Sequence, residues 1–262
     1  MTLEPLQYAL GALSGGLVGF VLGLVGGGGS ILAVPLMVYL VGVRDPHLAI
    51  GTSALAVAVN AASGLASHWR AGNVKWRCAS VFAASGIAGA ALGSTLGKAL
   101  DGQKLLFLFA IVMVVVGAVM LRRRGAEGNP EVHLGRENAG KLVAYGGGAG
   151  LFSGFFGIGG GFLIVPGLIA ATGMPMLNAV GSSLLAVTAF GVTTAANYAL
   201  SGLIDWPLAA VFILGGLGGS FVGSLSAGRL AEQRGLLTTV FAVLIFAVAA
   251  YVLWRSYAAF AG

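Results

Sequence analysis

Long apolar runs without a charged residue constrain this chain more than any other feature. Such runs extend from Leu105 to Leu121, from Leu177 to Leu200 and from Leu236 to Trp254. A helix of about 20 apolar residues crosses the hydrocarbon of a bilayer. The runs are continuous rather than alternating, which favours helices over a transmembrane barrel. With 58% hydrophobic and 8% charged residues, the sequence predicts an all-α polytopic membrane protein in the inner membrane.

The positive charge of the chain fits contact with lipid headgroups. The 14 Lys and Arg residues, which give a net charge of +6, lie between the apolar runs, as membrane-interface anchors do. We therefore expect lipid rather than nucleic acid as the partner of these charges. The first apolar run starts near Leu6 without a basic region before it or a cleavage motif after it, so we expect no removable signal peptide.

The sequence repeats itself. At an offset of 131, residues 19–35 match residues 150–166 at eight of seventeen positions, including both prolines, Pro35 and Pro166. At an offset of 130, residues 51–57 match 181–187 through Gly51, Ser53, Leu55, Ala56 and Val57. An internal repeat of this length indicates two homologous structural units. We predict a first transmembrane repeat at residues 1–121, a polar cytoplasmic linker at 122–140 and a second repeat at 141–262.

Each predicted repeat begins with one apolar stretch that is too long for a single helix. The stretches run from Tyr8 to Val43 and from Leu142 to Thr172, and each is interrupted by a glycine run followed by a proline. A straight helix of that length would overshoot the membrane at 1.5 Å per residue. We therefore predict two shorter helices with a break between them, followed by three ordinary spans. Each repeat then has about five helical segments, and the chain has 8–10 transmembrane segments.

The distribution of Lys and Arg weakly favours two crossings by each long stretch. That topology places ten basic residues on the cytoplasmic side and four outside, namely Arg44, Lys98, Lys104 and Arg255. A single crossing would give nine to five. An odd number of crossings per repeat predicts inverted repeats, an arrangement in which transporters place their site at the repeat interface. The termini are then expected outside and the linker inside.

The two glycine runs are the strongest candidate site. Glycine allows bare backbone to approach a ligand, and a helix that restarts after the run would direct N–H groups at an anion. The residues expected to bind substrate here are Gly27, Gly28, Gly29 and Ser30 in the first run and Gly159, Gly160 and Gly161 in the second. Other glycines recur at every fourth position, as in Gly15, Gly19 and Gly23 or Gly215, Gly219 and Gly223, and these predict close helix packing.

Polar residues inside the apolar spans are further candidates. Hydroxyl pairs after each long stretch could cap a helix or donate to a ligand. Amides within an apolar helix require a partner, which could be a ligand or a neighbouring helix. Two residues near the cytoplasmic face suit either interfacial anchoring or a substrate vestibule. The hydroxyl candidates are Thr52, Ser53, Ser182 and Ser183, the amide candidates are Asn60 and Asn197, and the candidates near the cytoplasmic face are His68 and Arg70.

Several chemical classes lack their residues in this sequence. No Asp or Glu interrupts an apolar span, which argues against cation transport or a buried proton relay. No nucleophile elbow, HExxH motif or His and Cys cluster is present, so we expect no enzyme, no metal site and no cofactor. The single Cys78 cannot form an internal disulfide. No ATP-binding glycine motif with Lys is present, so transport would run on a gradient or a partner.

The duplicated motif resembles that of a known family. The segments GLVGGGGSILAVPLM and SGFFGIGGGFLIVPGL, each followed by a GTS or GSS segment, resemble the TauE/SafE-type sulfite and sulfonate exporters, also called toluene sulfonate uptake permeases. The resemblance covers nearly the whole chain. It implies membrane transport of sulfite, sulfoacetate or related anions, with some members acting as importers.

The leading hypothesis is a secondary carrier of small sulfur-containing anions such as sulfite or C2 organosulfonates, with export as the expected direction. A passive anion channel, an uptake permease for another small organic anion and a membrane sensor subunit remain alternatives. The many small-residue helix faces make a homodimer plausible, although they could equally be used within one chain.

Overall fold

The computed structural model of the chain describes residues 4–122, 128–129, 131–157, 161–231 and 236–261, and those ranges contain helices and no strand. This confirms the all-α prediction. Six apolar stretches in this part of the chain are long enough to cross a membrane. The predicted first repeat contains α1 (Pro5–Val25), η1 (Gly26–Leu32), α2 (Ala33–Pro35), η2 (Leu36–Leu40), α3 (Pro46–Arg70), α4 (Trp76–Lys98) and α5 (Gly102–Arg122). The second contains α6 (Arg136–Phe156), α7 (Gly161–Thr172), α8 (Met176–Ala199), α9 (Trp206–Ala231) and α10 (Leu236–Ala261).

The first long apolar stretch folds back on itself as a helical hairpin. One arm is α1 and the other arm is η1, α2 and η2. Near the open end, Gln7 Nε2 donates a hydrogen bond to the Val41 carbonyl at 3.0 Å. Near the turn, Gly29 lies directly against the backbone of Leu22. The two arms are therefore antiparallel, and the stretch returns to the end of the molecule at which it started.

The second long stretch has the same break. Its first arm, α6, ends at Phe156, and Gly157 follows in the left-handed conformation at φ 66° and ψ 17°. The second arm is α7, where a Cβ added at Gly167 would lie 3.8 Å from Tyr145 Cβ of α6. Both predicted helix breaks are thus present. The helix α6 begins at Arg136, inside the segment expected to be linker.

The first hairpin does not resume as a regular α-helix, which differs from the expectation for both glycine runs. Residues Gly26–Leu32 wind as a 3₁₀ helix, and only Ala33–Pro35 are α-helical. Leu36–Leu40 then form a π turn, in which the Val41 N–H bonds the Leu36 carbonyl five residues back. Pro35 has no N–H to donate and its ring crowds the carbonyl four residues earlier, so regular α-helical winding is disfavoured at this point.

Small residues allow helices of opposite repeats to touch along their backbones. Gly15, Gly19 and Gly23 of α1 lie against the backbone of α9 at Phe212, Gly216 and Ser220. The equivalent residues of α6 and α4 make the equivalent contacts, at Gly146 with Phe82, Gly150 with Gly86 and Gly154 with Ala90. The helix-packing role predicted for the regularly spaced glycines is confirmed. Each hairpin is thereby joined to the fourth helix of the other repeat.

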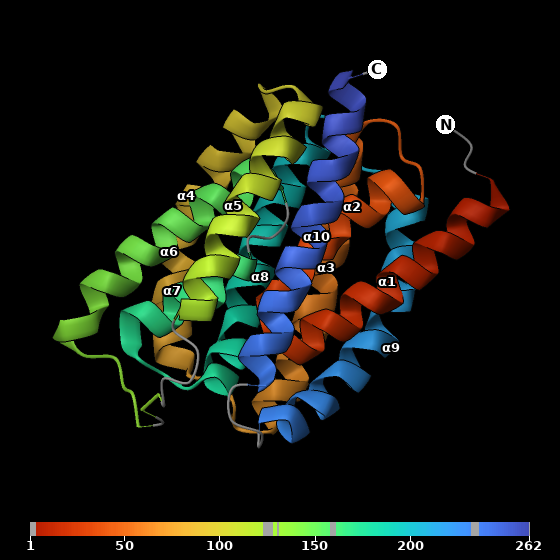
Figure 1. Cartoon of the computed structure of the whole chain (residues 1–262). Coiled ribbons are helices and arrows are strands. Elements are labelled where there is room, and N and C mark those ends of the chain that lie inside the picture. Colours follow the sequence, from red (N-terminus) through yellow and green to blue (C-terminus); the bar gives the residue numbers. More distant parts are fainter. Residues whose placement is uncertain (1–3, 123–127, 130, 158–160, 232–235, 262) are drawn as a thin grey trace.

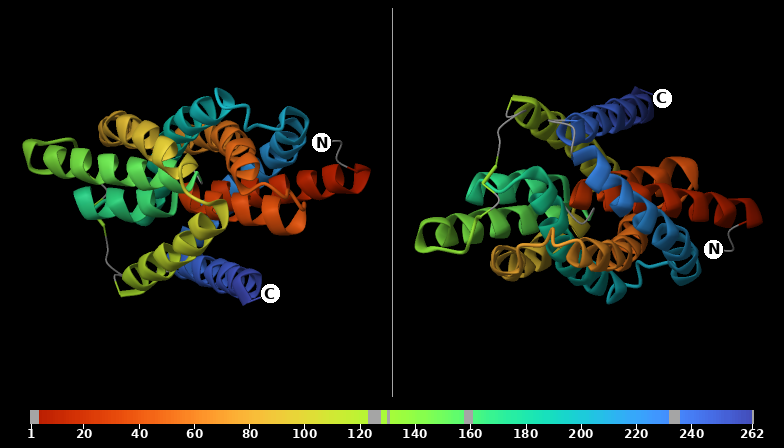
Figure 2. Two further views of the ribbon diagram at one scale, coloured as in Figure 1. Left: turned by 90° about the horizontal axis from the view of Figure 1, so that it is seen from above. Right: turned by 90° about the horizontal axis from the view of Figure 1, so that it is seen from below.

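The centre of the bundle is formed by α3 and α8, which run antiparallel. A Cβ at Gly51 would lie 2.9 Å from Tyr198 Cβ, and a Cβ at Gly191 would lie 3.0 Å from Ala58 Cβ. The equivalent helices α5 and α10 pack on each other and lie together at one side of the remaining bundle (Figure 2). Figure 1 shows that α1 begins and α10 ends at one end of the molecule, whereas α5 ends and α6 begins at the other.

Aspartates at the ends of connections start three of the helices. The Asp45 carboxylate accepts the His47 N–H at 2.8 Å before α3, and Asp101 accepts the N–H groups of Gln103 and Lys104 at 3.1 Å before α5. Asp205 accepts the Leu208 N–H at 3.0 Å before α9. Because such caps satisfy otherwise orphaned N–H groups, these acidic residues have a structural task at the ends of the bundle.

Candidate functional site

The turn of the first hairpin is held against the start of α8. Gly26 has φ 66° and ψ −142°, a backbone conformation that residues other than glycine rarely adopt. A Cβ at Gly26 would also lie 2.6 Å from both Ser183 Oγ and the Val180 carbonyl. The turn of the second hairpin is equally tight, because Gly157 lies directly against the Ile50 side chain of α3. Each turn is therefore seated on the central helix of the other repeat.

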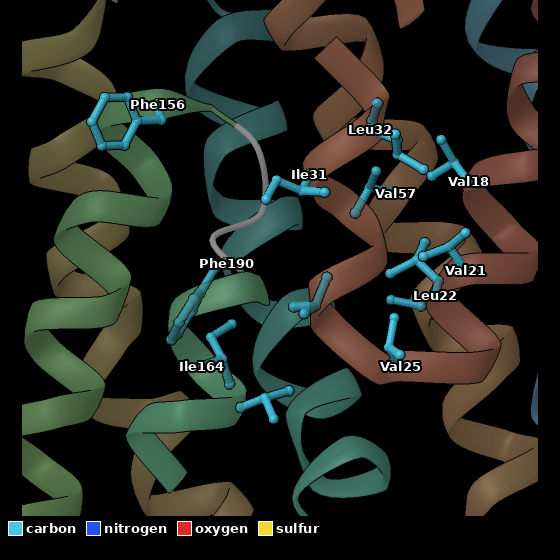
Figure 3. Packing of buried hydrophobic residues seen from close by; sticks show 14 of the residues in the cluster. Val18, Val21, Leu22, Val25, Ile31, Leu32, Val57, Phe156, Ile164 and Phe190 are labelled. Atoms are coloured by element: carbon cyan, nitrogen blue, oxygen red, sulfur yellow. The ribbon is translucent and has the colours of Figure 1, made fainter. Parts of the chain in front are cut away.

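The candidate residues of the first glycine run are all buried, and Gly27 and Ser30 form hydrogen bonds. The Gly27 N–H donates to Ser183 Oγ at 2.9 Å, and Ser30 Oγ donates to the Gly27 carbonyl at 2.8 Å. Gly28 and Gly29 are buried beside them. Figure 3 shows the apolar side chains around this turn, with Leu22 and Val25 on α1 and Ile31 and Leu32 on η1. The first run thus presents backbone and hydroxyl groups inside an apolar core.

The second glycine run is described only in part. Gly159 and Gly160 lie outside the described residues, and Gly161 begins α7. Ser53, which is the repeat equivalent of Ser183, is fully buried and donates to the Ile50 carbonyl at 3.0 Å. Ile50 in turn contacts Gly157. Ser53 therefore lies close to the second helix break, just as Ser183 lies close to the first.

The other two hydroxyl candidates bind connections between helices. Thr52 Oγ1 accepts the Asp205 N–H at 2.9 Å, just before α9. Ser182 Oγ accepts the Lys75 N–H at 2.9 Å, just before α4. These two bonds are equivalent under the repeat. They tie the start of each central helix to the opposite repeat. Thr52 and Ser182 therefore bind connections between helices, whereas Ser53 and Ser183 lie near the hairpin turns.

The two candidates at the end of α3 occupy different environments. His68 is 1% exposed, and its Nε2 lies 2.8 Å from the Gly23 carbonyl at the end of α1. Its Nδ1 lies 3.4 Å from Asn73 Nδ2. Interfacial anchoring therefore does not describe His68, which is part of the first turn. Arg70 is exposed at the end of α3 and is not brought to the turn.

The two amide candidates also differ. Asn60 is fully buried against Gly216 of α9, and neither atom of its amide has a described hydrogen-bond partner. In contrast, Asn197 joins α8 to α4. Its Nδ2 donates to Ser94 Oγ at 2.6 Å and to Thr95 Oγ1 at 2.9 Å, and its Oδ1 accepts from Lys98 Nζ at 2.6 Å. Asn197 thus has the interhelical role that the sequence left open.

The structure gathers part of the predicted set around the first turn, namely Gly27, Ser30, Ser183 and His68. These groups are neutral hydroxyls, backbone amides and an imidazole, which can donate hydrogen bonds to an anion. Within the described ranges, no group of three or more His, Cys, Asp or Glu residues is placed to hold a metal ion. Sequence reasoning missed Asn73, which reaches His68 from the α3–α4 connection, and Lys98, which it counted only as a topological charge.

The comparisons with known proteins agree with a membrane transporter. The family model described as sulfite exporter TauE/SafE matches residues 11–252. A probable membrane transporter protein of Xylella fastidiosa strain Temecula1 is 53% identical over 263 residues, covering 98% of each chain. The probable membrane transporter protein YdhB of Bacillus subtilis strain 168 is 27% identical over 215 residues, covering 79% of this chain and 85% of its own. No solved structure matches the chain.

Proposed function

From the premise that the chain belongs to the TauE/SafE sulfite exporter family, we propose that it is a secondary carrier for small sulfur-containing anions. Sulfite and C2 organosulfonates are the proposed substrates, export is the proposed direction, and the inner membrane is the proposed location. The relatives are named as probable membrane transporters, without a substrate. The substrate class is therefore argued from the chemistry of the site.

The observation that carries this proposal is the hydrogen-bonded turn at Gly27. A hydroxyl from α8 and bare glycine backbone meet there at 2.9 Å, inside the apolar part of the bundle. Ser30 and the His68 imidazole lie at the same turn, and no carboxylate is among the described contacts of these residues. Neutral donors in a region of low dielectric favour an anion over a cation. Sulfite and sulfonate groups offer several oxygens to such donors.

We further propose that the repeats are inverted in the membrane and that transport alternates access between them. The two hairpins enter from opposite ends of the molecule (Figure 1), and each turn is seated on the central helix of the opposite repeat. Movement of one hairpin therefore changes contacts in both repeats. Carriers with inverted repeats open by moving one repeat against the other around the site.

A flux assay in proteoliposomes tests the proposal against a passive anion channel. Saturable uptake of labelled sulfite or sulfoacetate with counterflow is expected for a carrier, whereas flux that rises linearly with concentration would indicate a channel. A panel that adds sulfate, acetate and other carboxylates tests the alternative of an uptake permease for another organic anion. A bound anion at 100 times its dissociation constant should also stabilise the fold by about 2.7 kcal/mol.

A homodimer was expected from the small-residue helix faces, and it stays a proposal. The small-residue faces that suggested it, such as Gly15, Gly19 and Gly23, are occupied by α9 within the same chain. Native mass spectrometry in detergent would decide the oligomeric state.

A further inference from the structure

Lys98 makes an unusual set of contacts at the end of α4. Its ammonium donates to Asn197 Oδ1 at 2.6 Å, to the Asn197 carbonyl at 3.1 Å and to Ser201 Oγ at 2.8 Å. It also lies 5.7 Å from the centre of the Tyr198 ring, within the range of a cation–π contact. Every described partner of this half-buried cation is therefore a neutral group on α8 or just after it.

Acidic residues are present at this end of the bundle, but they are engaged elsewhere. Asp45, Asp101 and Asp205 each accept backbone N–H groups at the start of a helix. Lys98 forms no ion pair with any residue in the described ranges. Its positive charge is hydrogen-bonded to neutral groups and is not paired with a described carboxylate, and a partly buried cation without an ion-pair partner attracts anions.

The neighbours of Lys98 include buried polar atoms that have no described partner, and one of them, the Tyr198 hydroxyl, is a donor. Tyr198 is 0% exposed, and its hydroxyl has no described partner. The His47 ring lies 6.4 Å from the Tyr198 ring. His47 Nε2 is 3.0 Å from the Leu100 carbonyl, whereas its buried Nδ1 has no described partner. A buried hydroxyl without a partner is costly, and a ligand that supplies an acceptor would remove that cost.

These residues lie next to the turn of the second hairpin. Gly97, the neighbour of Lys98, is directly against the Phe155 carbonyl in the last turn of α6. Tyr198 contacts Gly51, which follows the Ile50 that seats Gly157. In the repeat, Tyr198 occupies the position of His68, which bonds the first hairpin at Gly23. The cluster is thus the counterpart, at the other end of the bundle, of the His68 environment.

We propose that Lys98, Tyr198 and Ser201 form a docking site for small oxyanions at the end of the bundle where α4 and α8 terminate. The proposal rests on the proposed anion transport and adds a charged station beside the second turn. A docked oxyanion accepts from Lys98 Nζ in place of Ser201 Oγ. The Tyr198 hydroxyl, which has no described partner, can then donate to it, and Ser201 Oγ can redirect to the anion the bond that it now donates to the Asn197 carbonyl at 3.4 Å.

The competing explanation is that Lys98 only caps α8. Cations near a helix C-terminus stabilise its carbonyls, and Lys98 does bond the Asn197 carbonyl. Capping accounts for that one bond, but it does not require the buried Tyr198 hydroxyl to remain without an acceptor. The two explanations differ in whether the charge of Lys98 affects anion affinity.

Flux measurements on Lys98 variants in proteoliposomes distinguish the explanations. Lys98→Gln is expected to raise the KM for sulfite or sulfoacetate about tenfold, the size of one lost charge-assisted hydrogen bond. Lys98→Arg keeps the charge and should stay near the wild-type KM. Lys104→Gln is the matched control, because it removes an exposed lysine from the neighbouring α5 and should leave KM unchanged. Tyr198→Phe should raise KM several-fold.

Ser201→Ala keeps the proposal testable if Lys98→Gln does not fold. It removes a proposed donor to the anion and leaves the charge of Lys98, so docking predicts a KM about fivefold above wild type, the size of one neutral hydrogen bond. A pure cap predicts lower thermal stability in Ser201→Ala and Lys98→Gln with unchanged KM, and that result would overturn docking. Equal losses of affinity in Lys98→Arg and Lys98→Gln would also overturn it.

Anion-dependent thermal stabilisation separates this proposal from the proposed function. Sulfite, sulfoacetate, sulfate, acetate and chloride are the probes. If wild-type protein transports no sulfite but an anion stabilises it more than it stabilises Lys98→Gln, docking stands and the substrate proposal falls. Saturable sulfite flux that does not depend on Lys98 would support the substrate proposal and overturn docking. Equal stabilisation of wild type and Lys98→Gln by every probe overturns docking.

Discussion

Ser183 Oγ accepts a hydrogen bond from the Gly27 N–H at 2.9 Å and donates one to the Val180 carbonyl at 2.7 Å. One hydroxyl therefore connects the backbone of a central helix to the turn of a hairpin that is 156 residues away in sequence. Because Ser183 and Gly27 lie in different predicted repeats, this bond would couple the movements that we propose for them.

Replacing Ser183 with alanine should lower transport and reduce stability by about 1 kcal/mol, the contribution of one neutral hydrogen bond in a membrane protein. The Gly27 N–H would lose its acceptor in an apolar setting. Flux in proteoliposomes and thermal unfolding in detergent are the measurements. Ser224→Ala is the control, because that exposed hydroxyl bonds only the Phe221 carbonyl within its own helix. Equal behaviour of the two variants would contradict a coupling role for Ser183.

Gly26→Ala should destabilise the protein far more than Gly72→Ala. Both glycines have positive φ, at 66° and 74°. A Cβ at Gly26 would meet Val180 and Ser183, whereas a Cβ at Gly72 would have nothing within 4 Å. The expected losses are about 3 kcal/mol or more at Gly26 and about 1 kcal/mol at Gly72. Thermal unfolding of both variants checks this, and similar losses would show that packing at the turn is unimportant.

Asn60→Leu should raise stability and lower transport. The Asn60 amide is fully buried without a described partner, so an apolar side chain of similar volume removes a cost of about 1–3 kcal/mol. If the amide binds substrate during transport, its loss reduces flux. Asn197→Leu is the contrast, because it breaks bonds to Ser94, Thr95 and Lys98 and should lower stability. An active Asn60→Leu variant would remove Asn60 from the site.

The apolar runs were enough to predict the helical class, the two glycine runs predicted the breaks that begin at Gly26 and Gly157, and the four-residue spacing of other glycines predicted their packing role. These features are local, because glycine runs and proline disrupt a helix wherever they occur. The 3₁₀ and π winding after Gly26 was not predictable, since it depends on how Pro35 and the adjacent α1 arm pack together.

The assignment of individual hydroxyls also lay beyond the sequence. Ser182 and Ser183 are neighbours in the chain, yet one bonds the Lys75 N–H and the other bonds the Gly27 N–H. A helix turns by about 100° per residue, so adjacent side chains face different partners, and only the tertiary arrangement identifies them. In both cases the partner of the serine lies in the other repeat. Lys98 was overlooked for the same reason, because its neutral partners come from α8.

Both ends of the chain should lie outside the cytoplasm, and the connection between α5 and α6 should lie inside. Each hairpin returns to its starting end, and three further helices follow it, so each repeat reverses sides. Cysteine labelling tests this in a Cys78→Ala background, which leaves only the added thiol. Single cysteines at Thr2 and Gly128 should react from opposite sides of the membrane. Reaction of both from the same side would reject the five-plus-five topology.

Gly28→Leu should abolish transport while the protein still inserts into the membrane, and Gly160→Leu is expected to behave in the same way. Gly28 is buried in the first turn, where a leucine side chain would fill the space in which we propose that a ligand approaches bare backbone. Gly219→Leu should instead impair folding or assembly, because Gly219 lies directly against the Gly16 carbonyl of α1 and a side chain would push the two helices apart. Anion binding and flux must be compared on variants of verified expression and monodispersity. Normal anion binding by both Gly28→Leu and Gly160→Leu would place the substrate site away from the glycine turns, and Arg70 and the cytoplasmic vestibule would be tested next.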